Sequence, residues 1–243
     1  MPTSFFDKEL ARLRESLIQM GEAVEKMLDN ALAALRTGDV ELAEKTVQMD
    51  KVINDFDNRI TNKTILLIAT NQPVAGDLRF LAASLRLAGD LERIGDLSAN
   101  VARRVKGLAA VKHLVALPDD LDELAILARE ILSKAVNAFA QKDVEAARAV
   151  LEMDNELDHL NRRIRREMVD QIALDGPKIF WGLELIYAAA HLERLGDHAT
   201  NLAEDVIYIY SGRNVRHCGS KSCGSLPAAL ARGDHSDHED LED

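Results

Sequence analysis

The sequence predicts an all-α fold made of two tandem three-helix bundles, followed by a mobile acidic C-terminal tail. Three observations support this prediction. Aromatic residues make up only 4% of the 243 residues, while the helix formers Ala, Leu, Glu and Arg are abundant. Apolar residues recur every three or four positions, as they do on one face of an α-helix. The pattern of the first half of the chain returns in the second half, which indicates an internal repeat.

The first helix is predicted from a long apolar stripe, which then breaks. The stripe consists of Leu10, Leu13, Leu17, Met20, Val24, Met27, Leu28, Ala31 and Leu35. The segment Thr37-Gly38-Asp39 ends this helix. Asp39 can cap the next helix, and Glu41 adds an acid to its first turn.

Five further helices follow from the same periodicity. They are expected at about residues 40–69, 77–106, 120–140, 143–174 and 178–211. Pro73, Pro118 and Pro177 mark breaks between them, because proline is found at helix starts and in loops rather than in helix interiors. Helices of about 25–30 residues are rods of about 40 Å, and such rods with short connections form bundles.

The internal repeat is visible residue by residue. GDVELAEKTVQMD, which ends at Asp50, matches KDVEAARAVLEMD, which ends at Asp154, at an offset of 104. LERIGDLSAN and LERLGDHATN match at an offset of 101, so we expect a three-residue loop difference between Pro73 and Glu92. A single continuous six-helix array is the alternative arrangement of the same elements.

The repeat sets the expected domain boundaries. We expect the first bundle at residues 1–110, the second at 118–212 and a flexible tail at 213–243. The tail ends in DHSDHEDLED, which holds six acids and no Lys or Arg. Such a segment cannot bury enough apolar surface to fold.

Charge and composition exclude several classes of function. The chain has 30 basic and 41 acidic residues and a net charge of −11, which argues against nucleic acid as a partner. Two cysteines near the C-terminus, Cys218 and Cys223, do not make a secreted disulfide scaffold. The charged N-terminus is no signal peptide, and no stretch approaches the about 18 apolar residues of a membrane span. We therefore expect a cytoplasmic protein.

Carboxylate and amide side chains recur on the second and third helices of each repeat. Spacings of four, seven and eight residues place them on one helix face. The first repeat has Asp50, Asn54, Asp57, Glu92, Asp96 and Asn100, and the second has Asp154, Asp158, Asn161, Glu193, Asp197 and Asn201. Each repeat therefore offers four carboxylates and two amides from two helices that should be neighbours.

Four facing carboxylates require a cation or a proton. Oxygen ligands on bundle helices suit magnesium, manganese, calcium or a carboxylate-bridged iron cluster. Gly95 and Gly196 are expected in the middle of a helix, where glycine costs about 1 kcal/mol of helix stability relative to alanine. We interpret this cost as a sign that another group approaches the backbone at these positions. The candidate metal ligands are Asp50, Asp57, Glu92, Asp96, Asp154, Asp158, Glu193 and Asp197. A solvated or salt-bridged acidic face is the alternative interpretation.

Several motifs resemble those of a known family. They are Leu91-Glu92-Arg93-Ile94-Gly95-Asp96, Leu192-Glu193-Arg194-Leu195-Gly196-Asp197, Gln72-Pro73 followed by Asp77-Leu78-Arg79, and Arg216-His217. Over about residues 5–217 the chain resembles the PhoU family of accessory regulators of bacterial phosphate-specific transport. The resemblance implies two three-helix bundles with Glu/Asp-xxx-Asp motifs. In some members these motifs bind multinuclear iron or zinc clusters, and magnesium or manganese stay open for this chain. Asn54 departs from the motif, and Asp57 can take its place.

The resemblance also implies a function. It implies a non-enzymatic negative regulator of phosphate-starvation signalling and phosphate uptake. Such a protein docks onto the sensor histidine kinase of the phosphate regulon and onto the ATPase subunit of the phosphate ABC transporter, and reaches the membrane only through these protein partners. Rods with exposed faces also make a homodimer an expected state.

The alternative function is a carboxylate-bridged multinuclear metal-binding protein with an enzymatic or metal-storage role. A ferritin-like enzyme would carry Glu-xx-His on two bundle helices. Here Gly95 and Gly196 stand three places after the motif glutamates, so no catalytic residue is expected. The basic run at residues 161–166 is interpreted as a solvated surface, with an acidic partner or lipid headgroups as the functional alternative.

Overall fold

The computed structural model describes residues 4–111, 117–174 and 178–215. These residues form α1 (Phe5–Thr37), α2 (Val40–Asn71), α3 (Ala75–Val111), α4 (Asp119–Gln141), α5 (Val144–Leu174) and α6 (Ile179–Ser211). The predicted all-α fold is confirmed, and the described ranges contain no strand. Pro177 and most of the predicted tail, including both cysteines, lie outside the described residues.

The break between α1 and α2 is made by the residues that the sequence indicated. Gly38 adopts a left-handed conformation with φ 72°, and its N–H donates to the Ala34 carbonyl at 2.8 Å. The Asp39 side chain then accepts a hydrogen bond of 3.0 Å from the Leu42 N–H. The carboxylate satisfies a backbone donor that the first turn of α2 leaves without an intrahelical partner.

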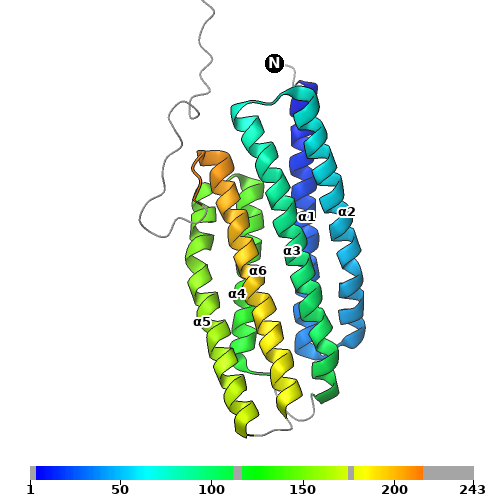
Figure 1. Ribbon diagram of the computed structural model, residues 1–243, viewed down its shortest axis with the longest axis vertical. Helices are drawn as coiled ribbons and strands as arrows, with labels where there is room; N and C mark the ends of the chain where they lie inside the picture. The colour runs from blue at the N-terminus through cyan, green and yellow to red at the C-terminus, as the bar shows by residue number, and fades with distance from the viewer. Residues whose placement is uncertain (1–3, 112–116, 175–177, 216–243) are drawn as a thin grey trace, which may run out of the picture.

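The six helices lie side by side as long rods, three from each repeat (Figure 1). α2 ends and α3 begins at the top of the view, whereas α5 ends and α6 begins at the bottom. The two repeats therefore run in opposite directions. They meet mainly where α3 packs antiparallel against α6, and α1 packs against α4 behind them.

Buried apolar side chains from all six helices form one cluster, so the two repeats share a core. Small residues allow helices to approach closely within it. A Cβ on Gly21 of α1 would lie 2.9 Å from a methyl group of Val136 in α4. That separation is too short for two carbon atoms, so this contact between the repeats requires glycine at position 21.

The three-residue difference between the repeats lies in a helix and not in a loop, which corrects the sequence-based expectation. α3 begins at Ala75 and α6 begins at Ile179, an offset of 104 that still matches the two prolines. The offset falls to 101 only further along these helices, at Glu92 and Glu193. Three residues are close to one helical turn, so α3 has about one more turn before its motif glutamate than α6 has.

Candidate functional site

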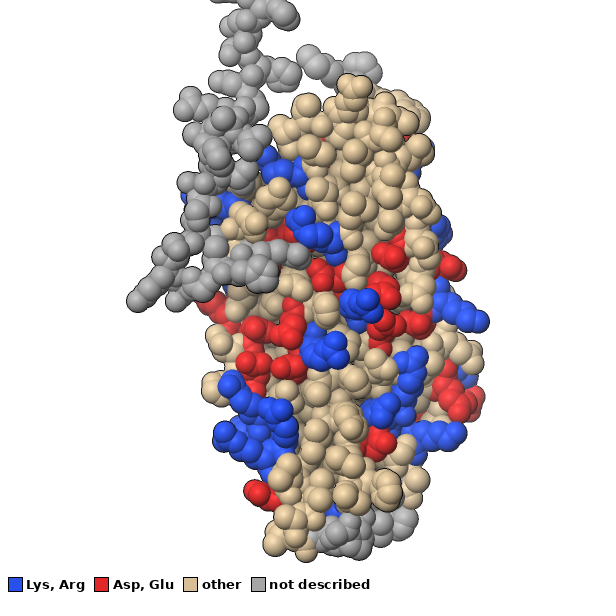
Figure 2. Space-filling model, viewed as in Figure 1, with Lys and Arg blue, Asp and Glu red and all other residues tan. Residues whose placement is uncertain are grey.

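The eight predicted acidic residues gather in two groups, one in each repeat. Asp50 and Asp57 of α2 face Glu92 and Asp96 of α3, and Asp154 and Asp158 of α5 face Glu193 and Asp197 of α6. We call these groups the first and second carboxylate faces. On the face drawn in Figure 2, acidic side chains accordingly gather around the middle of the molecule.

Burial and mutual repulsion perturb the first carboxylate face. The pKa of Asp50 is raised by burial and then by the charge of Asp96. Burial also raises the pKa of Asp57. The pKa of Glu92 is raised by burial and next by Asp96, with smaller contributions from Asp57 and Asp50. The folded chain therefore holds these carboxylates in an environment that disfavours their ionised form.

Cationic and amide groups offset part of this repulsion on the first face. Arg93 Nη1 lies 3.3 Å from Asp96 Oδ2, and Arg93 Nε lies 3.6 Å from Glu92 Oε2. Asn54 donates its amide to Asp50 Oδ2 at 3.3 Å. The charge of Arg103 acts on Asp50 in the same direction. Arg93 thus pairs with neighbouring acids of its own helix.

The second carboxylate face is acidic at every motif position. The pKa of Asp154 is raised by burial, then by Asp197 and Asp158. The pKa of Glu193 is raised by burial first, and then by the charges of Asp197, Asp158 and Asp154. The pKa of Asp197 is raised by burial first, and then by the charge of Asp158. Asp158 has one counter-ion in Arg162, whose Nη2 lies 3.6 Å from Asp158 Oδ2.

The donor atoms of both faces fit hard or borderline metal ions in type and in charge. Asp50 Oδ1 is buried and accepts no hydrogen bond in the structure. A buried oxygen of this kind is costly unless a proton or cation satisfies it. Among the described residues, however, no three acidic, His or Cys side chains already converge as a metal site. Metal binding by the two faces therefore stays a prediction.

The four predicted amides make different contacts in the described structure. Asn100 accepts a hydrogen bond of 2.6 Å from Arg103, and Asn161 is buried. Asn201 donates to Asp90 across the α3–α6 interface at 3.3 Å. Only Asn54 hydrogen-bonds a motif carboxylate in the described structure. The expectation of two amides on each face therefore stays a prediction at the other three positions.

The motif glycines are explained by helix packing and not by a ligand. A Cβ on Gly95 would lie 3.1 Å from Ile53 Cγ2 of α2, and a Cβ on Gly196 would clash with the Leu157 side chain of α5. The neighbouring helix is what approaches the backbone at these positions. The glycines thereby bring α2 close to α3, and α5 close to α6, so that the carboxylates of each face can meet.

Sequence reasoning missed the polar contacts that join the two repeats. His198 Nδ1 lies 2.9 Å from Asp90 Oδ1 across the α3–α6 interface. One helical turn away, Arg86 binds Asp205 through hydrogen bonds of 2.6, 3.0 and 3.2 Å. The sequence placed these groups on helices but carried no signal for which residues of the other repeat they meet.

No helix of the described residues is long and apolar enough to cross a membrane.

Comparison with protein families gives a match in both repeats. The model of the PhoU domain matches residues 17–105 and again residues 121–206. Phosphate-specific transport system accessory protein PhoU homologs of Rhizobium meliloti and Pseudomonas aeruginosa are 36% and 35% identical to this chain over 209 and 214 residues. The first alignment covers 86% of this chain and 88% of the relative, and the second covers 88% of each.

Solved structures show the same architecture. The crystal structure of PhoU from Pseudomonas aeruginosa has a TM-score of 0.81 at 33% identity, over 85% of this chain and 99% of that one. The phosphate transport system regulatory protein PhoU from Streptococcus pneumoniae has a TM-score of 0.78 at 29% identity, over 86% of this chain and 99% of that one.

Proposed function

The chain belongs to the PhoU family, and from this premise we propose that it is a non-enzymatic accessory regulator of phosphate transport. In this proposal it restrains phosphate-starvation signalling and phosphate uptake while phosphate is plentiful. The observation that carries the proposal is the match of both repeats to the PhoU domain, at residues 17–105 and 121–206. The relatives that align over most of this chain are named accessory proteins of the phosphate-specific transport system.

The proposed mechanism is docking onto two partners. One is the sensor histidine kinase of the phosphate regulon, and the other is the ATPase subunit of the phosphate ABC transporter. Docking can change the activity of a partner only if the two states of that partner bind with different affinities. Helices that share one core, as these do, offer rigid surfaces for such a distinction. A cytoplasmic location and a homodimeric state are part of the proposal.

We propose that both carboxylate faces hold metal ions, iron or zinc in the first place. Asp50, Asp57, Glu92 and Asp96 would be the ligands in the first repeat, and Asp154, Asp158, Glu193 and Asp197 in the second. A bound cation supplies positive charge that offsets carboxylate repulsion. The side chains of each face come from two helices. A cation bound by both helices would therefore stiffen that helix pair. The raised pKa values of Asp50 and Asp154 mean that protons compete with a cation for the oxygens of these two carboxylates.

The metalloenzyme alternative has less support than the regulatory proposal. The positions three residues after Glu92 and Glu193 are filled by glycines that pack against Ile53 and Leu157. A histidine there would collide with the neighbouring helix, so the Glu-xx-His pattern of ferritin-like centres could not be accommodated. A storage role predicts many more metal ions per chain than two ligand sets can bind, and elemental analysis distinguishes the two roles.

The regulatory proposal is tested in a strain that lacks the gene. In phosphate-rich medium the deletion should switch on a phosphate-starvation reporter, and the full-length chain supplied in trans should restore repression. Unchanged reporter activity in the deletion strain would contradict the proposal. Purified chain should also retain the isolated kinase and the isolated ATPase subunit in a pull-down, and retention of neither would remove the docking mechanism.

A further inference from the structure

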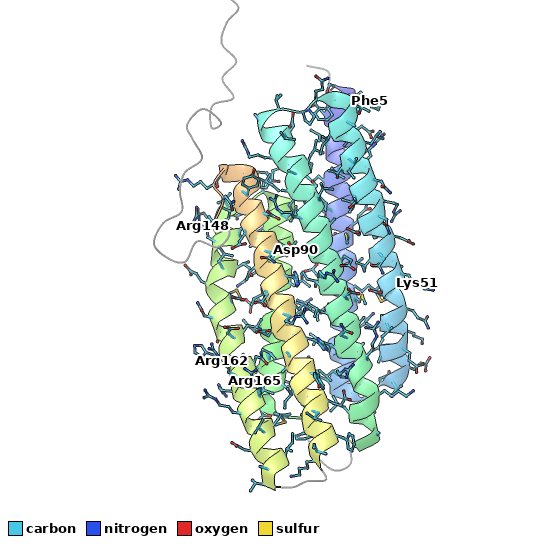
Figure 3. All side chains as sticks on the ribbon, in the orientation of Figure 1. Phe5, Lys51, Asp90, Arg148, Arg162 and Arg165 are labelled. Atoms are coloured by element: carbon cyan, nitrogen blue, oxygen red, sulfur yellow. The ribbon has the colours of Figure 1, made fainter. Side chains whose placement is uncertain are left out.

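Helices α3 and α6 pack together between α2 and α5, and polar side chains follow their line of contact. On α6 these side chains recur every three or four positions, at Glu184, Tyr187, His191, Arg194 and His198. The lower end of the line is fixed by Arg104 of α3, whose Nη1 lies 3.4 Å from Glu184 Oε2. The upper end is fixed by Asp90, labelled in Figure 3, which contacts His198. His191 and Arg194 therefore lie between two contacts with α3, and we call this row of side chains the α3–α6 strip.

Cationic groups surround His191 in the middle of the α3–α6 strip. The pKa of His191 is lowered by burial first, and then by the charges of Arg104, Arg194 and Arg103. Arg103 and Arg104 belong to the first repeat and Arg194 to the second, so guanidinium groups of both repeats act on one imidazole. Arg103 and Arg194 each also act on one carboxylate of the neighbouring face. The electrostatic environment of His191 is nevertheless positive, and it favours an anion.

Two of these side chains carry polar atoms that lack a partner. Arg104 Nε and His191 Nδ1 are buried and form no hydrogen bond among the described residues. Arg104 Nε always carries a hydrogen, so it is a donor that needs an acceptor, and leaving it unsatisfied costs free energy. An oxygen atom of an anion would satisfy it. Both residues are only half-buried as a whole, so a rotation of the guanidinium group and of the imidazole ring can bring these atoms to solvent.

Glu184 gives the strip a preference for an anion that carries a proton. Its carboxylate lies beside Arg104, and a Cβ on Gly107 of α3 would lie 3.0 Å from Glu184 Cδ and Oε1. A carboxylate repels a fully ionised anion, but it accepts a hydrogen bond from an anion that keeps an O–H group. Hydrogen phosphate keeps an O–H group at neutral pH and sulfate does not. Donors of Arg104 and His191 next to the acceptor of Glu184 therefore match phosphate better than sulfate.

We infer that the α3–α6 strip binds inorganic phosphate, with Arg104 and His191 donating to its oxygens and Glu184 accepting from its O–H group. The biological role of this site rests on the proposed function, because a regulator of phosphate transport that binds phosphate would sense it directly. The ligands come from both repeats, so a bound phosphate would also fix α3 against α6. Guanidinium groups suit this task, since their hydrogen bonds to phosphate are charge-assisted.

The experiment is isothermal titration calorimetry on the full-length chain, freed of metal by a chelator that is then dialysed away. We expect saturable binding of inorganic phosphate, weaker binding of sulfate and no binding of chloride. Arg104→Lys keeps the charge but removes the Nε donor, and His191→Phe keeps a ring but removes its nitrogens. Each should raise the Kd for phosphate by about tenfold or more, as expected for the loss of a charge-assisted hydrogen bond. Glu184→Gln should reduce the preference for phosphate over sulfate.

Lys106→Gln is the matched control, because it removes a positive charge from the same helix. Lys106 lines a groove against α2 with Val40 and Ala43, and its charge is not among those that act on His191. The control should leave the Kd for phosphate unchanged, and circular dichroism establishes that each variant is folded.

Four results would each overturn the inference. They are no binding of phosphate, sulfate binding as tight as phosphate binding, an equal loss of binding in Lys106→Gln and Arg104→Lys, and binding that appears only after zinc is added. The last result would place phosphate on metal ions held by the carboxylate faces. The assay uses purified chain and no reporter strain, so its failure would leave the proposed regulation standing. Unchanged reporter activity in the deletion strain would likewise leave the binding result standing.

Discussion

Asp90 of α3 and His198 of α6 are joined across the interface of the two repeats, with Asp90 Oδ1 2.9 Å from His198 Nδ1. Asp90 lies two residues before Glu92 of the first carboxylate face, and His198 directly follows Asp197 of the second. The two faces are therefore separated along the chain by about a hundred residues and are joined in space through Asp90, which contacts both His198 and Asn201.

This contact should contribute measurably to the packing of the two repeats. A double-mutant cycle with Asp90→Ala and His198→Ala should give a coupling free energy of about 0.5–3 kcal/mol, because both groups are half-buried and in direct contact. Urea denaturation of the four proteins supplies the measurement. The exposed pair Lys45 and Glu41, on a single helix, is the control and should couple much more weakly because solvent screens it. Equal coupling in the two cycles would contradict a special role for the contact between repeats.

The ion pair of Arg86 and Asp205 should matter more. Asp205 is only 1% exposed, and Arg86 gives its carboxylate hydrogen bonds of 2.6, 3.0 and 3.2 Å. Replacing Arg86 by methionine should therefore lower the free energy of unfolding by about 3 kcal/mol, since a buried charge loses its main counter-ion. Arg36→Met is the matched control, because Arg36 pairs with an exposed Asp122 at 2.7 Å. The control should cost at most about 1 kcal/mol, and a comparable loss in both variants would refute this ranking.

The sequence predicted the parts of the structure that depend on local information. Helical periodicity located all six helices, and Gly38 and Asp39 marked the first break because turn and capping preferences act over a few residues. The carboxylates of each face could be grouped because the four-residue spacing within a helix and the repeat of the pattern constrain them together. Each face is formed by consecutive helices that fold back on one another.

Features that depend on packing between distant helices were not predictable in this way. Asp90 and His198 are 108 positions apart, and no periodicity in the sequence relates the register of α3 to that of α6. The same holds for Asn201, which bonds Asp90 instead of its own face. Gly196 looked like a place for a ligand because its partner, Leu157, belongs to a different helix. Only the folded structure shows which side chain fills the space that a glycine leaves.

The second carboxylate face should destabilise the metal-free protein at neutral pH. Because burial, then Asp197 and Asp158, raise the pKa of Asp154, the folded chain binds its proton more tightly than the unfolded chain does. Stability linked to this group is present at low pH and is lost as the pH rises through the raised pKa. Replacing Asp154 by asparagine should therefore stabilise the metal-free protein at pH 7 by about 0.5–1 kcal/mol, which is about 1–4 °C in Tm.

The pH dependence of that gain is the sharper measurement. Thermal unfolding in the presence of a chelator should show the difference between Asp154→Asn and the unmodified chain shrinking as the pH falls below 7. The difference should vanish below the ordinary Asp pKa of about 3.9, where the carboxyl is neutral in both the folded and the unfolded chain. A gain that is the same at pH 7 and pH 4 would show that the asparagine acts through packing and not through charge.

Two glycines of the motif-bearing helices should respond in opposite directions to alanine. A Cβ at Gly196 would meet the Leu157 side chain, so Gly196→Ala should force α5 and α6 apart and lower the free energy of unfolding by about 1–3 kcal/mol. Gly89 lies inside α3 with no atom within 4 Å of the place where a Cβ would be, so Gly89→Ala should stabilise by up to about 1 kcal/mol through helix propensity. Chemical denaturation of both variants tests the pair. If the Gly196 variant were as stable as the Gly89 variant, the close approach of α5 and α6 at position 196 would not be what retains this glycine, and a ligand at the backbone would again be the better explanation.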